Sequence, residues 1–280
     1  MRMCACRGTA GFAHVSCLAE QAKILFAEAL ENNLSTKVLN EKWTRWHACS
    51  LCEQQYHGVV RCAMGWACWK THVGRPEVDG SRRMAIGVLG NGLSHGGQHA
   101  DALPVIEAEL AMKRRLGVPE SSILVTQSNL AITYGELGRY EQSLQLERDV
   151  YSGRLKLLGE EHEETLLAAN NYAISLHRLQ RPKEASSVLR KMMPVAQRVL
   201  GESHETTLRI RLTYARGLYK APAAALDDLR EVVTTLEETA PIARRVLGSS
   251  QPVVVNIEKN LGCARETLRA REEASSLREA

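Results

Sequence analysis

Aromatic residues and proline are scarce in this sequence of 280 residues, and neither sign of charge is in large excess. Phe, Trp and Tyr make up 5% of the chain and only 8 residues are proline, which disfavours a sandwich or barrel of Tyr- and Val-rich strands. The 36 Lys and Arg residues against 32 Asp and Glu give a formal charge of +4 without a long basic run, which argues against a dedicated nucleic-acid-binding protein. We therefore expect an all-α fold and no nucleic-acid partner.

Long apolar runs are lacking as well. No stretch of about eighteen consecutive apolar residues occurs, so no membrane-spanning helix is predicted. The N-terminal segment is interrupted by Arg2, Arg7, Gly8, Gly11 and His14 instead of carrying the continuous apolar core of a signal peptide. We expect a soluble, cytoplasmic protein without a membrane partner.

Catalytic motifs are also missing. The sequence contains no Gly-x-Ser-x-Gly elbow, no phosphate-binding loop and no His-Glu-x-x-His helix, and no spacing of Ser, His and Asp singles out a triad. We accordingly predict no catalytic residue.

Cysteine is distributed unevenly along the chain. Seven of the eight cysteines precede residue 70, Cys263 is the eighth, and all four tryptophans lie in the same first segment. The remainder is rich in Ala, Leu, Glu and Arg, and the Gly- and Pro-containing stretch at 74–80 marks the change in composition. We expect a cysteine-rich segment at 1–57, an apolar helix and linker at 58–80, and a helical region at 81–280.

Residues 81–280 contain an internal repeat. Leu-Gly pairs recur at steps of 42, 42 and 47 residues, and a second marker keeps the same phase: Asn129-Leu130-Ala131, Asn171-Tyr172-Ala173, Thr213-Tyr214-Ala215 and Asn260-Leu261-Gly262. The glycines of the Leu-Gly pairs are Gly117, Gly159, Gly201 and Gly248. A short turn such as Gly138–Leu144 separates two helical patterns within each period, so each repeat is predicted to be helix, turn, helix.

The repeat resembles the tetratricopeptide repeat of the kinesin light chain type. The pattern Leu-Gly-x-x-His-x-x-Thr-Leu occurs at Leu158–Leu166 and again at Leu200–Leu208. The resemblance covers about 81–270 and implies a right-handed solenoid of about four helix pairs with a concave inner surface, closed by a capping helix at Arg265–Ala280. His162 and His204 are expected to serve a turn or packing role set by the repeat.

The resemblance also implies a binding groove lined by the first helix of each repeat. Asn129, Asn171 and Asn260 fall on these helices, where a carboxamide can pair with both N–H and C=O of an extended peptide. The alternative is that each Asn bonds to a neighbouring helix. Another set, Arg209, Arg211 and Arg216, either favours acidic peptides or forms a solvated face.

The cysteine-rich segment resembles the RING-CH (RING-variant) zinc finger. Cys4-Ala5-Cys6 is followed after seven residues by His14-x2-Cys17 and later by Cys49-x2-Cys52. The resemblance implies one zinc held by Cys4, Cys6, Cys49 and Cys52, whereas His14 and Cys17 supply half of a second site. The first cysteine pair of the family has no counterpart, and Gln21 stands where the family has tryptophan. The finger is therefore expected to be truncated at its start or degenerate.

Other residues could complete the second zinc site, namely His47, His57, Cys62, Cys68 and His72. However, Val59–Val73 is apolar on nearly all sides and is predicted to be a buried helix, on which Cys62 and Cys68 do not share a face. We expect these two thiols to pack in the core.

Two functions are compatible with this sequence. The favoured one is a small irregular zinc-finger segment followed by a tetratricopeptide-like scaffold whose groove binds a peptide or protein segment. The alternative is a substrate-recruiting RING-CH-type ubiquitin ligase, in which the finger holds a ubiquitin-conjugating enzyme and promotes transfer by proximity. Zinc is the one cofactor expected.

Overall fold

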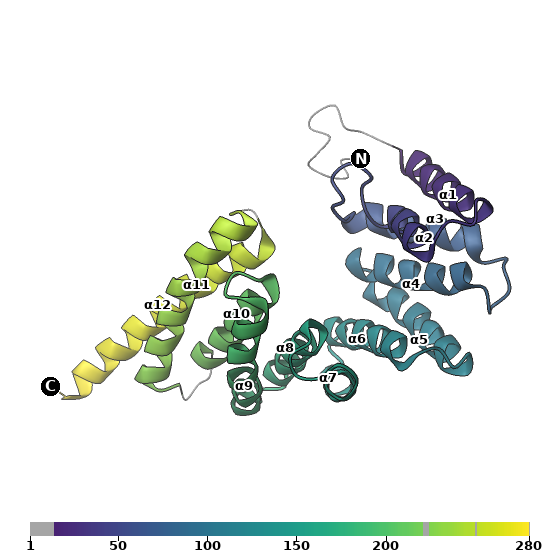
Figure 1. The fold of residues 1–280 in the computed structure, drawn as a ribbon. Helices are drawn as coiled ribbons and strands as arrows, with labels where there is room; N and C mark the ends of the chain where they lie inside the picture. Colours follow the sequence, from purple (N-terminus) through teal and green to yellow (C-terminus); the bar gives the residue numbers. More distant parts are fainter. Residues whose placement is uncertain (1–13, 221–223, 250, 280) are drawn as a thin grey trace. The chain divides into compact units, whose positions relative to one another are not determined.

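A computed structural model describes residues 14–220, 224–249 and 251–279, and their structure is helical (Figure 1). Within the described ranges, extended pairing is limited to one bridge between Ala48 and Gln55. The chain divides into two compact units, Met1–Arg139 and Tyr140–Ala280. The all-α prediction is confirmed.

The first unit begins with α1 (Val15–Glu31), α2 (Thr36–Trp43), a short 3-10 helix at Thr44–Trp46 and α3 (Gly58–His72). The expectation of a small irregular segment before the repeats is wrong for residues 15–46, whereas 47–57 is irregular as expected. Apolar residues at helical spacing explain the difference, because α1 buries Leu18, Ala22, Phe26 and Ala29 along one face.

An aromatic cluster forms the core under these helices. The ring centroids of Phe26 and Trp43 lie 4.8 Å apart in an edge-to-face arrangement, and Trp46 and His72 pack against the same group. Burial lowers the pKa of His72, with a smaller contribution from Arg75 in the same direction and an opposing one from Asp79. The imidazole is therefore neutral at pH 7 and acts as an aromatic core residue.

Helix α3 crosses the next helix, α4 (Gly80–His95), at very close range. A β-carbon on Gly92 would lie 2.8 Å from the carbonyl oxygen of Arg61, and one on Gly65 would lie 3.0 Å from that of Val88. Only glycine permits such an approach between two backbones. The segment before the repeats is thus packed directly on the first repeat helix.

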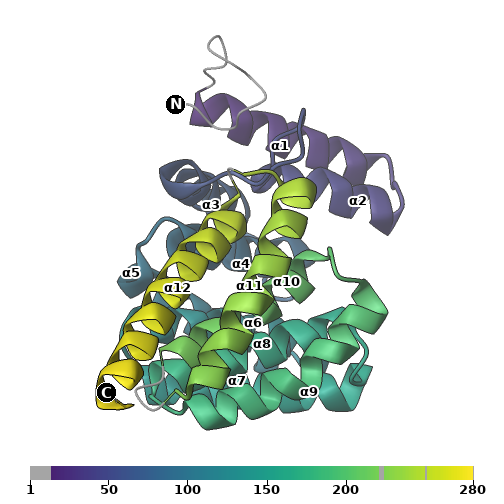
Figure 2. The ribbon, with the colours of Figure 1, turned by 90° about the vertical axis from the view of Figure 1, so that its left-hand side faces the viewer.

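The repeats are helix pairs, as predicted. In the first unit α4 pairs with α5 (His99–Arg115), which packs on α6 (Glu120–Glu136). In the second unit α7 (Tyr140–Leu158) packs on α8 (Glu163–Arg178), α8 on α9 (Pro182–Leu200), and α10 (Glu205–Tyr219) on α9 and α11 (Leu226–Leu247). The last helix, α12 (Pro252–Glu279), lies along α11 (Figure 2). It begins earlier than the capping helix expected from Arg265.

The repeat markers have the local roles that the sequence predicts. The glycines of the four Leu-Gly pairs have φ between 61° and 90°, the left-handed region that other residues disfavour. His162 and His204 are the N-caps of α8 and α10, where Nδ1 accepts a hydrogen bond from the backbone N–H two residues later, at 3.2 and 3.3 Å. Their turn role is confirmed.

Across the described ranges, no helix combines the length and the apolar character needed to cross a membrane.

Candidate functional site

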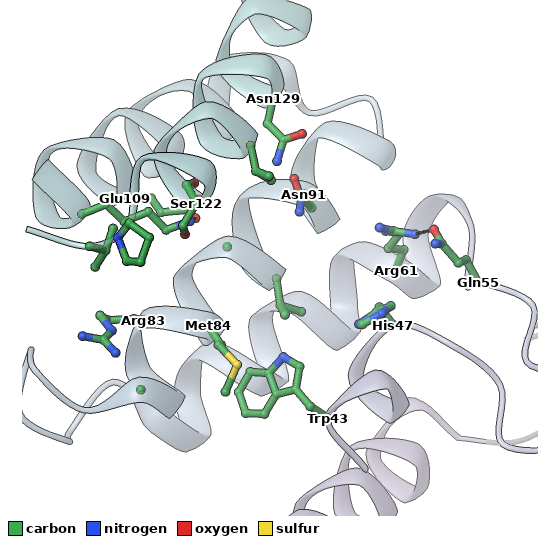
Figure 3. Close-up of a pocket in the computed structure, with 17 residues that line it drawn as sticks. Trp43, His47, Gln55, Arg61, Arg83, Met84, Asn91, Glu109, Ser122 and Asn129 are labelled. Atoms are coloured by element: carbon green, nitrogen blue, oxygen red, sulfur yellow. Dashed lines mark hydrogen bonds and ion pairs between the residues drawn. The ribbon is translucent and has the colours of Figure 1, made fainter. Parts of the chain in front are cut away.

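A hollow of roughly 620 Å³ opens in the first unit, where α4, α6 and the segment before α4 meet (Figure 3). Its apolar wall includes Met84 and Val88 of α4 and Val125 of α6. Trp43, otherwise in the aromatic core, reaches the hollow near Met84. The first helices of two repeats therefore face this hollow, which we call the α4/α6 groove.

A buried polar network supports one side of the α4/α6 groove. Lys113 Nζ lies 2.8 Å from Glu109 Oε1 and donates to Thr126 Oγ1 at 2.8 Å, and the Thr126 hydroxyl donates to the same carboxylate at 3.1 Å. The Glu109 side chain is 6% exposed and that of Lys113 is 13% exposed. The network joins α5 to α6, so it holds the groove wall in place.

Glu109 packs closely against a glycine of α4. A β-carbon on Gly87 would lie 3.0 Å from Glu109 Oε1, at the limit of tolerated contacts. Since Gly87, Glu109 and Lys113 all line the groove, the ion pair forms part of the groove wall.

Two carboxamides face each other across the α4/α6 groove. Asn91 of α4 and Asn129 of α6 are both half-buried, and their side chains point toward one another (Figure 3). A carboxamide donates and accepts at once, which suits the alternating N–H and C=O groups of an extended peptide. Asn129 is thus in the position that the sequence analysis expected, whereas Asn91 was missed.

Polar residues line the end of the groove beside α3. Arg61 donates from Nη1 to Gln55 Oε1, and the imidazole of His47 lies near this guanidinium (Figure 3). Burial lowers the pKa of His47, and the charge of Arg61 lowers it further. Arg83 lines the opposite end.

The other two asparagines have different surroundings. Asn171 lies on α8 and is half-buried. Asn260 is 9% exposed, and both ends of its carboxamide are engaged: Oδ1 accepts from the Tyr219 hydroxyl at 2.7 Å and Nδ2 donates to the Asn256 carbonyl at 2.7 Å. This is the bond to a neighbouring helix that the sequence left open as an alternative, so Asn260 is not available to a peptide.

The arginines of α10 do not form a free basic face. Arg209 pairs with Glu205 at 2.6 Å, and Arg211 is buried and pairs with Glu202 at 2.6 Å. Burial lowers the pKa of Arg216. Two of the three charges are therefore neutralised locally.

The expected zinc ligands lie only partly within the described residues. Cys4 and Cys6 fall in 1–13, outside them. His14 is the N-cap of α1, and Cys17 is exposed in its first turn. In the described part of the chain, no three His, Cys, Asp or Glu residues are grouped so as to hold a metal ion.

Cys49 and Cys52 lie in a tight turn bounded by the Ala48–Gln55 bridge. The Leu51 N–H donates to Cys49 Sγ at 3.4 Å, and the Glu53 N–H donates to the Cys49 carbonyl at 3.0 Å. Glu53 has a φ of 59°, so the chain reverses directly after Cys52. A backbone N–H aimed at sulfur stabilises a thiolate, the form that binds metal.

The two cysteines of α3 differ from each other. Cys68 is fully buried, and burial raises the pKa of its thiol. The Cys62 thiol is half-buried and donates to Gln98 Oε1 at 2.9 Å. Core packing thus holds for Cys68, whereas Cys62 joins α3 to the turn before α5.

Comparisons with known proteins agree with the helix pairs. The family model for the tetratricopeptide repeat matches residues 123–164 and 165–206. The match does not extend to the segment before α4. No curated protein matches the chain in sequence at a significant level.

Solved structures share the fold at low sequence identity. The nearly identical TPR-like repeats of a Podosopora anserina protein, described as a kinesin light chain, are 19% identical with a TM-score of 0.54, covering 84% of this chain and 98% of that one. BtubC (BKLC) from P. vanneervenii is 14% identical with a TM-score of 0.58, covering 95% and 88%. A Rap protein in complex with competence and sporulation factor is 11% identical with a TM-score of 0.50, covering 90% and 66%. The fold is therefore a tetratricopeptide-like solenoid of helix pairs.

Proposed function

We propose that this protein is a binding scaffold whose α4/α6 groove takes an extended peptide segment of a partner protein. The single observation that carries the proposal is the facing pair Asn91 and Asn129 beside an apolar wall. Such a pair can hold the peptide backbone, and Met84, Val88 and Val125 can take alternate side chains. The similarity to a Rap protein solved with competence and sporulation factor supports this use of the fold.

Replacing either asparagine by alanine should weaken peptide binding about five- to tenfold, because each variant loses a backbone hydrogen-bond pair. Dodecapeptides selected from a random library on the full chain are the probe, and fluorescence anisotropy gives their affinities. Asn256→Ala, on the exposed face of α12, is the matched control and should leave binding unchanged. The proposal fails if no peptide is selected, or if Asn91→Ala and Asn129→Ala bind as the parent does.

We also propose that the turn at Cys49 and Cys52 holds zinc. The N–H···S bond from Leu51 and the reversal at Glu53 support this, since they place both cysteines in one tight turn. Cys4 and Cys6 would complete a four-thiolate structural site, which stabilises the fold of the segment and performs no chemistry of its own. The ubiquitin-ligase alternative stays a prediction of the sequence resemblance alone.

Purified full-length protein should contain about one zinc per chain, and Cys52→Ser should lower the content to near zero because a site with three thiolates binds far more weakly. Elemental analysis measures the content, and Cys263→Ser in α12 is the control. A content near two would show that His14 and Cys17 have found further ligands. A parent protein without zinc, or a Cys52→Ser variant that keeps it, would refute the proposal.

A further inference from the structure

Arg61 is a partly buried cation. Among the described residues, its side chain has one hydrogen-bond acceptor, and that acceptor is neutral. Its Nη1 donates to the carboxamide oxygen of Gln55. Burial lowers the pKa of Arg61, and no carboxylate of the described residues offsets that effect. A guanidinium is usually paired with carboxylate when it is withdrawn from water, so this arrangement leaves an unused preference for an anion.

The other residues that line the α4/α6 groove offer Arg61 no free carboxylate. Burial lowers the pKa of His47 and of His95, and the charge of Arg61 lowers both further, so these imidazoles are neutral at pH 7. The acid in the groove lining, Glu109, is already paired with Lys113 at 2.8 Å. Arg83, at the other end, has no ion pair among the described residues. The groove therefore carries an excess of positive charge.

We propose that Arg61 forms an anion-binding subsite of the α4/α6 groove and receives an Asp or Glu side chain of the bound peptide. This inference rests on the proposed function and adds the chemical class of the ligand. Arg61 belongs to α3, outside the repeats that the family model matches, so the subsite is supplied by the segment that precedes the repeats. Gln55 can turn aside, because its side chain is exposed and its neutral bond to Arg61 is easily exchanged for a charged partner.

The position of Arg61 fits a peptide held by the two asparagines. Arg61 and Asn91 come from the neighbouring helices α3 and α4, which cross with almost no separation at Gly92. A peptide backbone held between Asn91 and Asn129 can therefore direct one side chain toward Arg61 while others meet Met84 and Val125 (Figure 3). The expected ligand is an acidic segment with apolar residues beside the acid.

A double-mutant cycle tests the subsite. Selected dodecapeptides are synthesised with each Glu changed to Gln or each Asp to Asn, and their affinities for the full chain are compared with those for Arg61→Gln. We expect one acid-to-amide change to weaken binding about tenfold in the parent and less than twofold in Arg61→Gln. Arg61→Lys, which keeps the charge but not the planar fork, should keep part of the discrimination.

Arg148→Gln is the matched control, because Arg148 also donates to a glutamine, Gln145 at 2.8 Å, but lies exposed on α7. The affinity of Arg148→Gln should fall about tenfold when the acid of the peptide is changed to its amide, as in the parent. Melting temperatures of all variants confirm that they fold. If peptides bind through Asn129 but the acid-to-amide change has equal effect on the parent and Arg61→Gln, this inference fails and the proposed function stands. If no peptide binds, both fail.

Discussion

Glu109→Gln is expected to lower the free energy of unfolding of the first unit by about 3 kcal/mol. Among the described residues, the substitution removes the one carboxylate paired with Lys113, whose side chain is 13% exposed and cannot regain full hydration. Removing one partner of a buried ion pair leaves an uncompensated charge, which is more damaging than losing both. The new amide N–H₂ group would lie beside Thr126 and Lys113, neither of which carries a carboxylate to accept its hydrogen bonds.

Urea unfolding followed by tryptophan fluorescence measures this effect selectively, because all four tryptophans lie in the first unit. The control is Glu161→Gln, which breaks the exposed pair with Arg198, both side chains being 67% exposed. It should change stability by less than about 0.5 kcal/mol. Equal effects of the two substitutions would show that Glu109 and Lys113 are hydrated in solution. Peptide binding should weaken in Glu109→Gln as well, since the network supports the groove wall.

Glu147→Gln should stabilise the second unit at neutral and alkaline pH. Burial raises the pKa of Glu147 from 4.5 to about 8, and the charge of Arg154 opposes this only partly. One carboxylate oxygen, Oε2, has no hydrogen-bond partner in the described structure. Because the folded-state pKa lies above the unfolded one, the unfolded chain releases this proton first as the pH rises. The stabilising contribution of the neutral Glu147 carboxyl is therefore fully present below pH 4.5 and is lost progressively up to about pH 8.

Glutamine does not titrate, so the variant should match the parent at pH 4.5 and exceed it by about 4 kcal/mol at pH 8.5. Unfolding followed by circular dichroism at several pH values gives the difference. Glu141→Gln, an exposed acid on the same helix, should show no pH-dependent gain. A Glu147→Gln variant that is no more stable than the parent at pH 8.5 would mean that water or a rearranged Arg154 reaches the carboxylate.

The repeat region could be predicted from the sequence because its signals are local and recur. Each Leu-Gly pair predicts a glycine with positive φ, and the structure has one at all four positions. His162 and His204 keep the same offset from these glycines and have the same capping role. Helix order follows directly from such markers, since each acts within a few residues of its own position.

The candidate site was predicted only in part, because it depends on contacts between distant residues. Asn129 could be found from its place in the repeat, but Asn91 lies in a Gly-Asn-Gly stretch without the repeat marker. The role of Arg61 depends on how α3 crosses α4, which periodicity does not reveal. Asn260 carries the same marker as Asn129 and is used internally, because Tyr219 stands within reach of its carboxamide.

The crossing of α3 and α4 at Gly65 and Gly92 joins the non-repeating segment before α4 to the first helix of the repeats. Contact between bare backbones cannot be adjusted by gradual changes in side-chain size, so this joint is either kept intact or lost altogether. Substitutions on α3 that spare the joint can then change the side chains presented to the α4/α6 groove without disturbing the repeats. The groove lining and the repeat architecture are thereby free to change separately.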